Sequence, residues 1–142
     1  VMNEAWRAGI APIIGGQMEV EEGFLLALEP FRDFMAGRVE AQTFETLASL
    51  RPDVPVLVPV GEAPFSVLVP SFLLSEIARA FQIGFVIFLP FLIIDLVVAA
   101  ILMSMGMMMV PPAIVSLPFK LAFFVVADGW SLIAGSLVQS YF

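Results

Sequence analysis

Residues 103–112 read MSMGMMMVPP, and this stretch separates two long apolar runs. Five methionines surround one glycine, and two prolines close the segment. Before it, Ile83 to Met105 is long enough to cross a hydrocarbon core of roughly 30 Å, which needs about 20 helical residues. After it, Ala113 to Val138 offers a second apolar helix. The sequence therefore predicts an all-α fold built on a helical hairpin of integral-membrane type, with kinks at Pro90 and Pro118.

Charge is almost absent from this half of the chain. Asp95 is the only charge between Phe81 and Phe119, and Asp128 is the only one from Leu121 onward. Charged residues make up 13% of the chain, against roughly 25% in an ordinary soluble domain. Two stretches of this length with a single charge each exceed what a small soluble core can bury, so we expect lipid or a large partner around them.

The first half of the chain is acidic. Residues 1–62 carry ten acidic and four basic side chains, a net charge of −6. We expect residues 1–14 to be the end of a preceding membrane-directed helix, and the chain to be a fragment of a longer protein. Residues 15–50 are expected to form a small helical segment, because glutamates precede an apolar run at helical spacing.

Two helices are predicted within residues 15–50. The first places four apolar side chains on one face: Phe24, Leu28, Phe31 and Met35. The second runs from Val39 to Leu50 and groups four residues on one side: Val39, Thr43, Leu47 and Leu50. The simplest interpretation is a small helical subdomain that packs on itself or on a neighbour.

A proline-rich linker is predicted between the two halves. Residues 51–69 are expected to be extended, because proline every few positions blocks helix. Within them, VLVPV (56–60) and FSVLV (65–69) have the pattern of a ragged β-hairpin. The apolar hairpin is then expected over residues 70–142, with Pro70 in the first helical turn.

A polar stripe marks the start of the apolar half. Its members are Ser71, Ser75, Arg79 and Gln82, and Glu76 stands three residues before Arg79, at ion-pair spacing. The stripe is either a solvated face or a face toward a subunit or a wet channel.

Catalytic and metal-binding chemistry is poorly supported. The chain has no Cys and no His, so thiolate or imidazole metal sites and the usual proton shuttles are missing. It also lacks a glycine-rich phosphate loop and a basic nucleic-acid patch. We therefore expect no enzyme, no cofactor, no metal and no nucleic-acid partner.

Two opposite charges in the hairpin are expected to meet. Asp95 lies thirteen residues before Met108 and Lys120 lies twelve after it. At about 1.5 Å per residue, both are roughly 18–20 Å from a turn at Met108. We predict a structural ion pair, within one chain or between neighbouring copies. The alternative is that Asp95 acts as a proton-relay carboxylate, a common role for an acid at membrane depth.

The methionines allow three interpretations. The residues concerned are Met103, Met105, Met107, Met108 and Met109. Thioethers bind Cu(I), although such sites usually also recruit His or Cys. Methionine also packs in ordinary cores. The third interpretation is a deformable seal, because the unbranched, polarizable side chain fills irregular gaps and re-packs around varied partners.

From Leu68 to Phe142 the sequence resembles the C-terminal half of the FliP family of flagellar type III export-gate proteins. Six pieces carry the resemblance: Ser75-Glu76, AFQIGF (80–85), PFLIID (90–95), GMMMVPP (106–112), LPFK (117–120) and DGW (128–130). PFRDFM (30–35) is similar to the acidic periplasmic helices of the family, more loosely.

The resemblance implies a core pore-forming subunit of the gate through which unfolded flagellar proteins are exported. It implies a homo-oligomeric ring, pentameric, with FliR-like and FliQ-like subunits, near FlhA-like and FlhB-like export components. The location would be the flagellar basal body in the bacterial inner membrane, with residues 15–66 on the periplasmic side. The methionine loop would line the narrowest point. Expected subunit contacts are Glu76, Arg79, Asp128 and Trp130.

Two other functions stay open at this point. Virulence-type injection systems contain a related export-gate subunit, although Val110-Pro111-Pro112 is more typical of the flagellar one. A small proton-coupled membrane transporter that uses Asp95 is the alternative from another class. A ring with FliR-like and FliQ-like proteins would distinguish a gate subunit from such a transporter.

Overall fold

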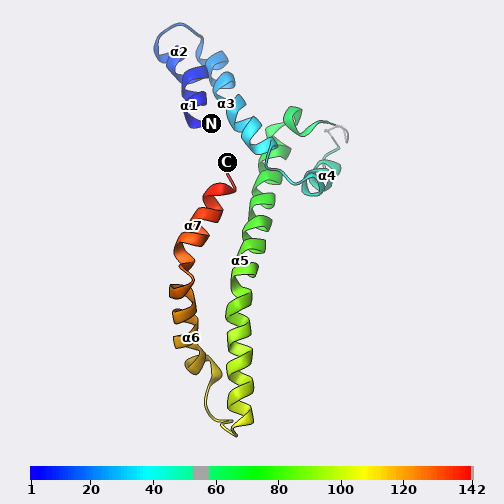
Figure 1. Cartoon of the computed structure of the whole chain (residues 1–142). Helices are drawn as coiled ribbons and strands as arrows, with labels where there is room; N and C mark the ends of the chain where they lie inside the picture. Colours follow the sequence, from blue (N-terminus) through cyan, green and yellow to red (C-terminus); the bar gives the residue numbers. More distant parts are fainter. Residues whose placement is uncertain (53–57, 142) are drawn as a thin grey trace. The chain divides into compact units, whose positions relative to one another are not determined.

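The computed structural model describes residues 1–52 and 58–141, and over these ranges its regular elements are all helices (Figure 1). In chain order they are α1 (Met2–Ala5), a π-helical turn (Trp6–Ile10), α2 (Ala11–Ile14), α3 (Val20–Ala36), α4 (Ala41–Ser49), a 3₁₀ turn (Val60–Glu62), α5 (Phe65–Ser104), α6 (Pro112–Val126) and α7 (Gly129–Gln139). The all-α class is confirmed. Two compact units divide the chain, Val1–Phe81 and Gln82–Phe142, and their boundary falls within α5.

In the first unit, the N-terminal helical turns pack closely on α3. Gly9 and Gly23 meet backbone to backbone, since a Cβ on Gly9 would lie 1.9 Å from the carbonyl oxygen of Gly23. Ala5 and Ala27 are buried beside them. These small residues let two helices approach where larger side chains would hold them apart.

The predicted apolar face of this helix is wrong at its start. Phe24 is 61% exposed, whereas Gly23 and Ala27 are buried. The reason is that the partner helix selects the smallest surface of α3, not its most apolar one. Pro30 lies inside α3 without ending it.

A second contact layer joins α4 to the first turns of α5. Phe44, Ala48, Ala63 and Val67 form a buried cluster. Val39 and Leu47 pack partly against it, as expected, but Leu50 is 71% exposed. The helical face that α4 buries is therefore rotated from the predicted one, toward Phe44 and Ala48.

The extended linker expected over 51–69 is shorter than predicted. Residues 53–57 lie outside the described part of the chain, and so does part of the strand predicted at 56–60. Residues 65–69, the other predicted strand, form the first turns of α5, so the ragged hairpin is wrong. The carbonyl of Pro64 accepts the backbone N–H groups of Val67 and Leu68, and the helix begins at Phe65, five residues before the expected start at Pro70.

The polar stripe of α5 turns inward within the first unit. Ser71 and Ser75 are buried, and their hydroxyls donate to the carbonyls of Val67 and Ser71. Ser75 Oγ also accepts the backbone N–H of Glu40, the residue that precedes α4. Ser71 and Ser75 therefore pack inside the chain itself. The two environments expected for the stripe were solvent, or a subunit or wet channel, and neither applies to these two residues.

The second unit is a hairpin of α5 against α6 and α7. The C-terminal arm bends by 57° between α6 and α7. Pro118, where we expected a kink, lies inside α6 without ending it. The bend falls at Asp128, which takes a left-handed backbone conformation with φ 49°. The next residue is Gly129, where a Cβ would lie 2.4 Å from the ring of Phe124.

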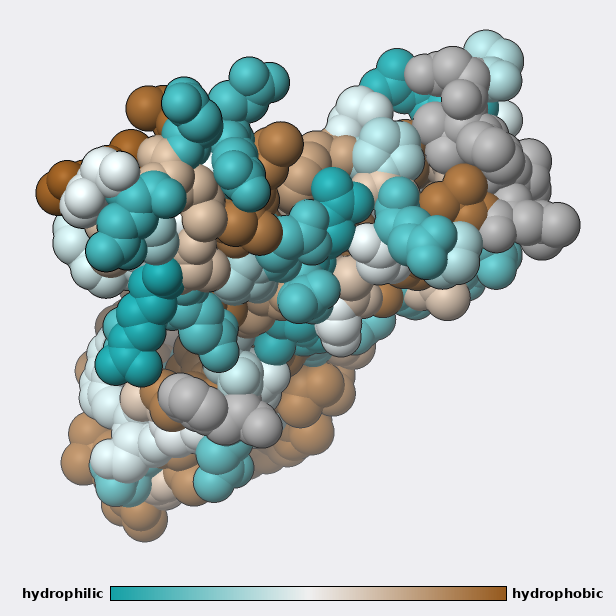
Figure 2. All heavy atoms as spheres, turned by 90° about the horizontal axis from the view of Figure 1, so that it is seen from above, coloured by the Kyte–Doolittle hydropathy of each residue, from teal (hydrophilic) through white to brown (hydrophobic). Residues whose placement is uncertain are grey.

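By length and composition, α5 can cross a membrane, and the bent pair of α6 and α7 meets the same criteria when taken together. Most of the hairpin's large apolar side chains are exposed in the isolated chain. On the face drawn in Figure 2, hydrophilic side chains are interspersed with exposed hydrophobic ones. The exposed apolar side chains of the hairpin require lipid or protein around them.

Candidate functional site

The methionine loop is built by a defined helix ending. The N–H of Gly106 bonds the carbonyl of Met103, and the N–H of Met107 bonds the carbonyl of Leu102. This pair of bonds is the Schellman motif, which requires a left-handed residue just beyond the helix. Gly106 supplies it with φ 73°. The last turn of α5 and the loop are therefore one hydrogen-bonded unit.

On its other side, the loop joins α6 through two prolines. Pro111 has an extended backbone with φ −63° and ψ 120°, and Pro112 is the first residue of α6. Proline suits both positions, because its fixed φ fits the first helical turn and its missing N–H has no partner to lose there. The connection is therefore constrained by backbone chemistry at both ends.

The thioethers of the loop lie on the surface of the chain. Met108 is 85% exposed and Met109 is 97% exposed, and Met103, Met105 and Met107 are exposed as well. Exposing five unbranched apolar side chains to water on one turn is unfavourable. The arrangement therefore favours contact with lipid or with another protein surface. Simple packing in the core of this chain is not what these side chains do here.

Beneath the loop, the structure places Asp95 and Lys120 in contact. Lys120 Nζ on α6 lies 2.7 Å from Asp95 Oδ2 on α5. Ser116, also on α6, donates its hydroxyl to the other carboxylate oxygen of Asp95. Both oxygens of the carboxylate are thus occupied, one by a cation and one by a hydroxyl.

An aromatic cluster supports the same hairpin. Phe91 of α5 meets Phe123 edge-on, with ring centroids 6.2 Å apart, and lies at a tilt to Phe124. Trp130, in the first turn of α7, meets Phe124 edge-on at 5.3 Å. Trp130 is nevertheless 77% exposed, and Asp128 is exposed too. Their role in subunit contacts stays a prediction.

Glu76 and Arg79 belong to an ion-pair cluster inside the first unit. Arg79 Nη1 and Arg38 Nε each lie 2.8 Å from Glu76 Oε1. Arg79 Nη2 also donates to the carbonyl of Arg38. The cluster ties Arg38, in the turn between α3 and α4, to α5, and a role for Glu76 and Arg79 between subunits stays a prediction.

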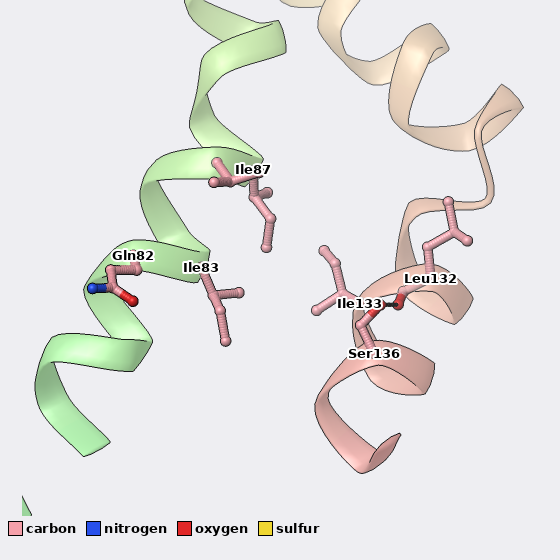
Figure 3. A pocket seen from close by; sticks show the side chains of 7 residues that line it. Gln82, Ile83, Ile87, Leu132, Ile133 and Ser136 are labelled. Carbon is pink, nitrogen blue, oxygen red and sulfur yellow. Dashed lines mark hydrogen bonds between the residues drawn. The ribbon is translucent and has the colours of Figure 1, made fainter. Parts of the chain in front are cut away.

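Two apolar clefts lie along the hairpin. One, of about 400 Å³, separates α5 from α7, where Ile83 and Ile87 point toward Ile133 (Figure 3). The other, of about 460 Å³, lies between α5 and α6 and reaches Met105. Among the described residues, no group of three or more His, Cys, Asp and Glu side chains could hold a metal ion.

Comparison with known proteins agrees with the motifs. A model described as the FliP family matches residues 1–137. The chain belongs to the FliP family. The flagellar biosynthetic protein FliP of Caulobacter vibrioides is 50% identical over 137 residues, which cover 96% of this chain and 51% of that protein. Those of Agrobacterium fabrum and Bacillus subtilis are 45% and 42% identical over 140 residues, each covering 98% of this chain.

The match to FliP is wider than the motifs suggested. It includes the acidic first half, where the motifs resemble the family more loosely. The chain spans about half the length of the curated FliP relatives it matches, with 51% of the Caulobacter protein and 57% of the Agrobacterium protein covered.

Two contacts of this FliP-family chain were missed by sequence reasoning. Ser116 stands four residues before Lys120, so both share one face of a helix, and that spacing was a usable signal. Arg38 lies thirty-eight residues before Glu76, and no local pattern links them. Only the packing of α4 on α5 makes that pair.

Proposed function

We propose that this chain is a pore-forming subunit of the flagellar type III protein export apparatus, and that its methionine loop seals the channel for unfolded flagellar proteins. Family membership supports the flagellar export role, and each relative named above is called a flagellar biosynthetic protein. That naming favours the flagellar system over a virulence-type one.

The observation that carries the seal is the exposure of the loop. Met108 and Met109 are the most exposed methionines of the hairpin, at a turn held by Gly106 and two prolines. Copies arranged around an axis would bring these thioethers together, where they exclude water and ions yet yield to a passing polypeptide. A rigid β-branched or aromatic plug would yield less readily.

The contacts of Asp95 disfavour the transporter alternative. A titrating carboxylate must exchange protons with water or substrate, but both oxygens of Asp95 are engaged by Lys120 and Ser116. We propose that the Asp95–Lys120 pair is structural and takes no part in proton transport. Assembly into a ring with FliR-like and FliQ-like subunits, next to FlhA-like and FlhB-like components, belongs to the same proposal.

The test of the seal is truncation of Met107, Met108 and Met109 to alanine. Small-solute leak across the inner membrane should rise, while secretion of flagellar subunits falls less. Replacing the three by leucine, which keeps volume but adds a branch, should restore most of the seal. Truncating Val125 and Val126, exposed in α6, is the matched control. A leak that stays at the wild-type level in the triple alanine variant refutes the seal.

The location proposed is the bacterial inner membrane within the flagellar basal body, with residues 15–66 on the periplasmic side. A protease added from the periplasm should then cut unassembled protein between Arg51 and Glu62. Complete protection of that stretch, in cells whose periplasm the protease demonstrably enters, contradicts the placement.

A further inference from the structure

Three side chains on facing helices form a compact polar cluster in the hairpin. Asp95 projects from α5, and Ser116 and Lys120 project from α6. Ser116 is fully buried, at 0% exposure, whereas Asp95 and Lys120 are partly exposed. A buried hydroxyl in an apolar helix pair needs a hydrogen-bond partner, and here its partner is a carboxylate.

The hydroxyl has two acceptors and one hydrogen. Asp95 Oδ1 accepts it, and the carbonyl oxygen of Ala113 lies 3.1 Å away on the same helix. A bond to an ionised acceptor is roughly twice as strong as a neutral one, so the hydrogen belongs to Asp95. Ser116 therefore makes a directional bond between helices, where the local carbonyl offers only a weaker alternative.

Ser116 and Lys120 constrain Asp95 differently. The ammonium of Lys120 is a point charge on a flexible four-carbon stem, so it can follow the carboxylate over several ångströms. The hydroxyl of Ser116 sits on one carbon, so its bond exists at a single helix rotation and a single axial position. We propose that Ser116 is a register residue, which fixes α6 on α5 and thereby positions the methionine loop.

The surrounding surfaces select a register only weakly. From Ile83 to Ala127, Asp95 and Lys120 are the only charged residues, and the neighbouring contacts are apolar side chains and aromatic edges. Dispersion and burial depend little on a slip of one helical turn, about 5.4 Å, along such a surface. Directional polar bonds then decide among the possible alignments.

The position of Ser116 makes this register matter for the loop. Ser116 lies four residues, or about 6 Å, from Pro112, where the loop ends. The other end of the loop is tied to α5 by the bonds of Gly106 and Met107. A slip of α6 would therefore be taken up within the loop and would displace its methionines. This consequence rests on the proposed seal, whereas the register itself does not.

The experiment measures the register directly. Nitroxide labels on cysteines at Ile101 of α5 and Val125 of α6, both exposed, report axial slip through their distance distribution. The full-length protein is used in a cysteine-free background, in membranes of the bacterium that expresses it. Ser116→Ala should change the ratio of registers by about tenfold, the effect of losing one charge-assisted hydrogen bond, and so broaden or split the distribution.

Two variants make the assignment specific. Ser104→Ala removes an exposed hydroxyl that bonds the carbonyl of Ile101, and it should keep the wild-type distribution. Lys120→Met removes the charge but keeps the stem, and it should also keep one narrow distribution because Ser116 stays. A wild-type distribution in Ser116→Ala, or splitting in Lys120→Met alone, overturns the proposal.

Helix retention in Ser116→Ala is checked by circular dichroism, since alanine favours helix and removes only one oxygen. Solute leak separates the two proposals. A split distribution with unchanged leak keeps the register role of Ser116 and refutes the seal. Increased leak with an unchanged distribution keeps the seal and refutes the register role.

Discussion

Replacing Gly9 with alanine tests a close backbone contact between helices in the first unit. The added Cβ would lie 1.9 Å from the carbonyl oxygen of Gly23 and 2.7 Å from the Cβ of Ala27. Ordinary contact begins at 3.4 Å, so α3 would have to retreat by about 1.5 Å. A rotamer change cannot relieve the clash, because the obstacle is main chain. The contact that buries Ala5 and Ala27 would open with it.

The expected loss is about 2 kcal/mol of unfolding free energy. Overpacking a tight contact costs about 1–3 kcal/mol, and a backbone obstacle places Gly9→Ala at the upper end. Alanine in a helical turn is about 1 kcal/mol more favourable than glycine in helix propensity, and this offsets part of the overpacking cost. Gly23→Ala should cost less, because its Cβ chiefly meets the side chain of Ile13, which can move.

The assay is denaturant unfolding in mild detergent, followed by fluorescence. Trp6 and Trp130 are the two tryptophans, one in each unit, so a Trp130→Phe background leaves Trp6 to report on the first unit. Gly61→Ala is the matched control, because a Cβ there has open space. Equal midpoints for Gly9→Ala and Gly61→Ala would refute the close contact between the N-terminal turns and α3.

Three further predictions concern the hairpin and the ion-pair cluster. Asp95→Ala and Lys120→Ala should each impair assembly, measured by pull-down. The double swap Asp95→Lys with Lys120→Asp should recover part of the lost assembly. No recovery means that the two charges do not act as a pair. Gly106→Ala should destabilise the hydrogen-bonded end of α5 by about 1–2 kcal/mol, the cost of a left-handed alanine. The expected sign is faster hydrogen exchange of the backbone amides there. Unchanged exchange contradicts the Schellman ending. Glu76→Gln should release Arg38 and speed tryptic cleavage after it, whereas equal cleavage rates mean that the ion pair does not hold this segment.

The sequence by itself determined the features that depend on local chemistry. Two apolar runs with very few charges predict a hairpin, because helix length and solvent preference are properties of the run alone. Gly106 and the two prolines predict where it turns, because backbone conformation is a property of these residues. Equal distances from the turn predicted that Asp95 and Lys120 lie at one level, and the structure has them in contact.

Only the tertiary structure decided which surfaces meet. Gly9 and Gly23 have no hydrophobic signal, yet they form a close helix contact, because neither residue has a side chain to hold the two backbones apart. Phe24 was expected inside and lies outside for the same reason. The 57° bend between α6 and α7 falls at Asp128, where Gly129 leaves room for the ring of Phe124. Which face of a helix becomes buried depends on the surface of the helix that packs against it, and the sequence of one segment carries no information about that surface.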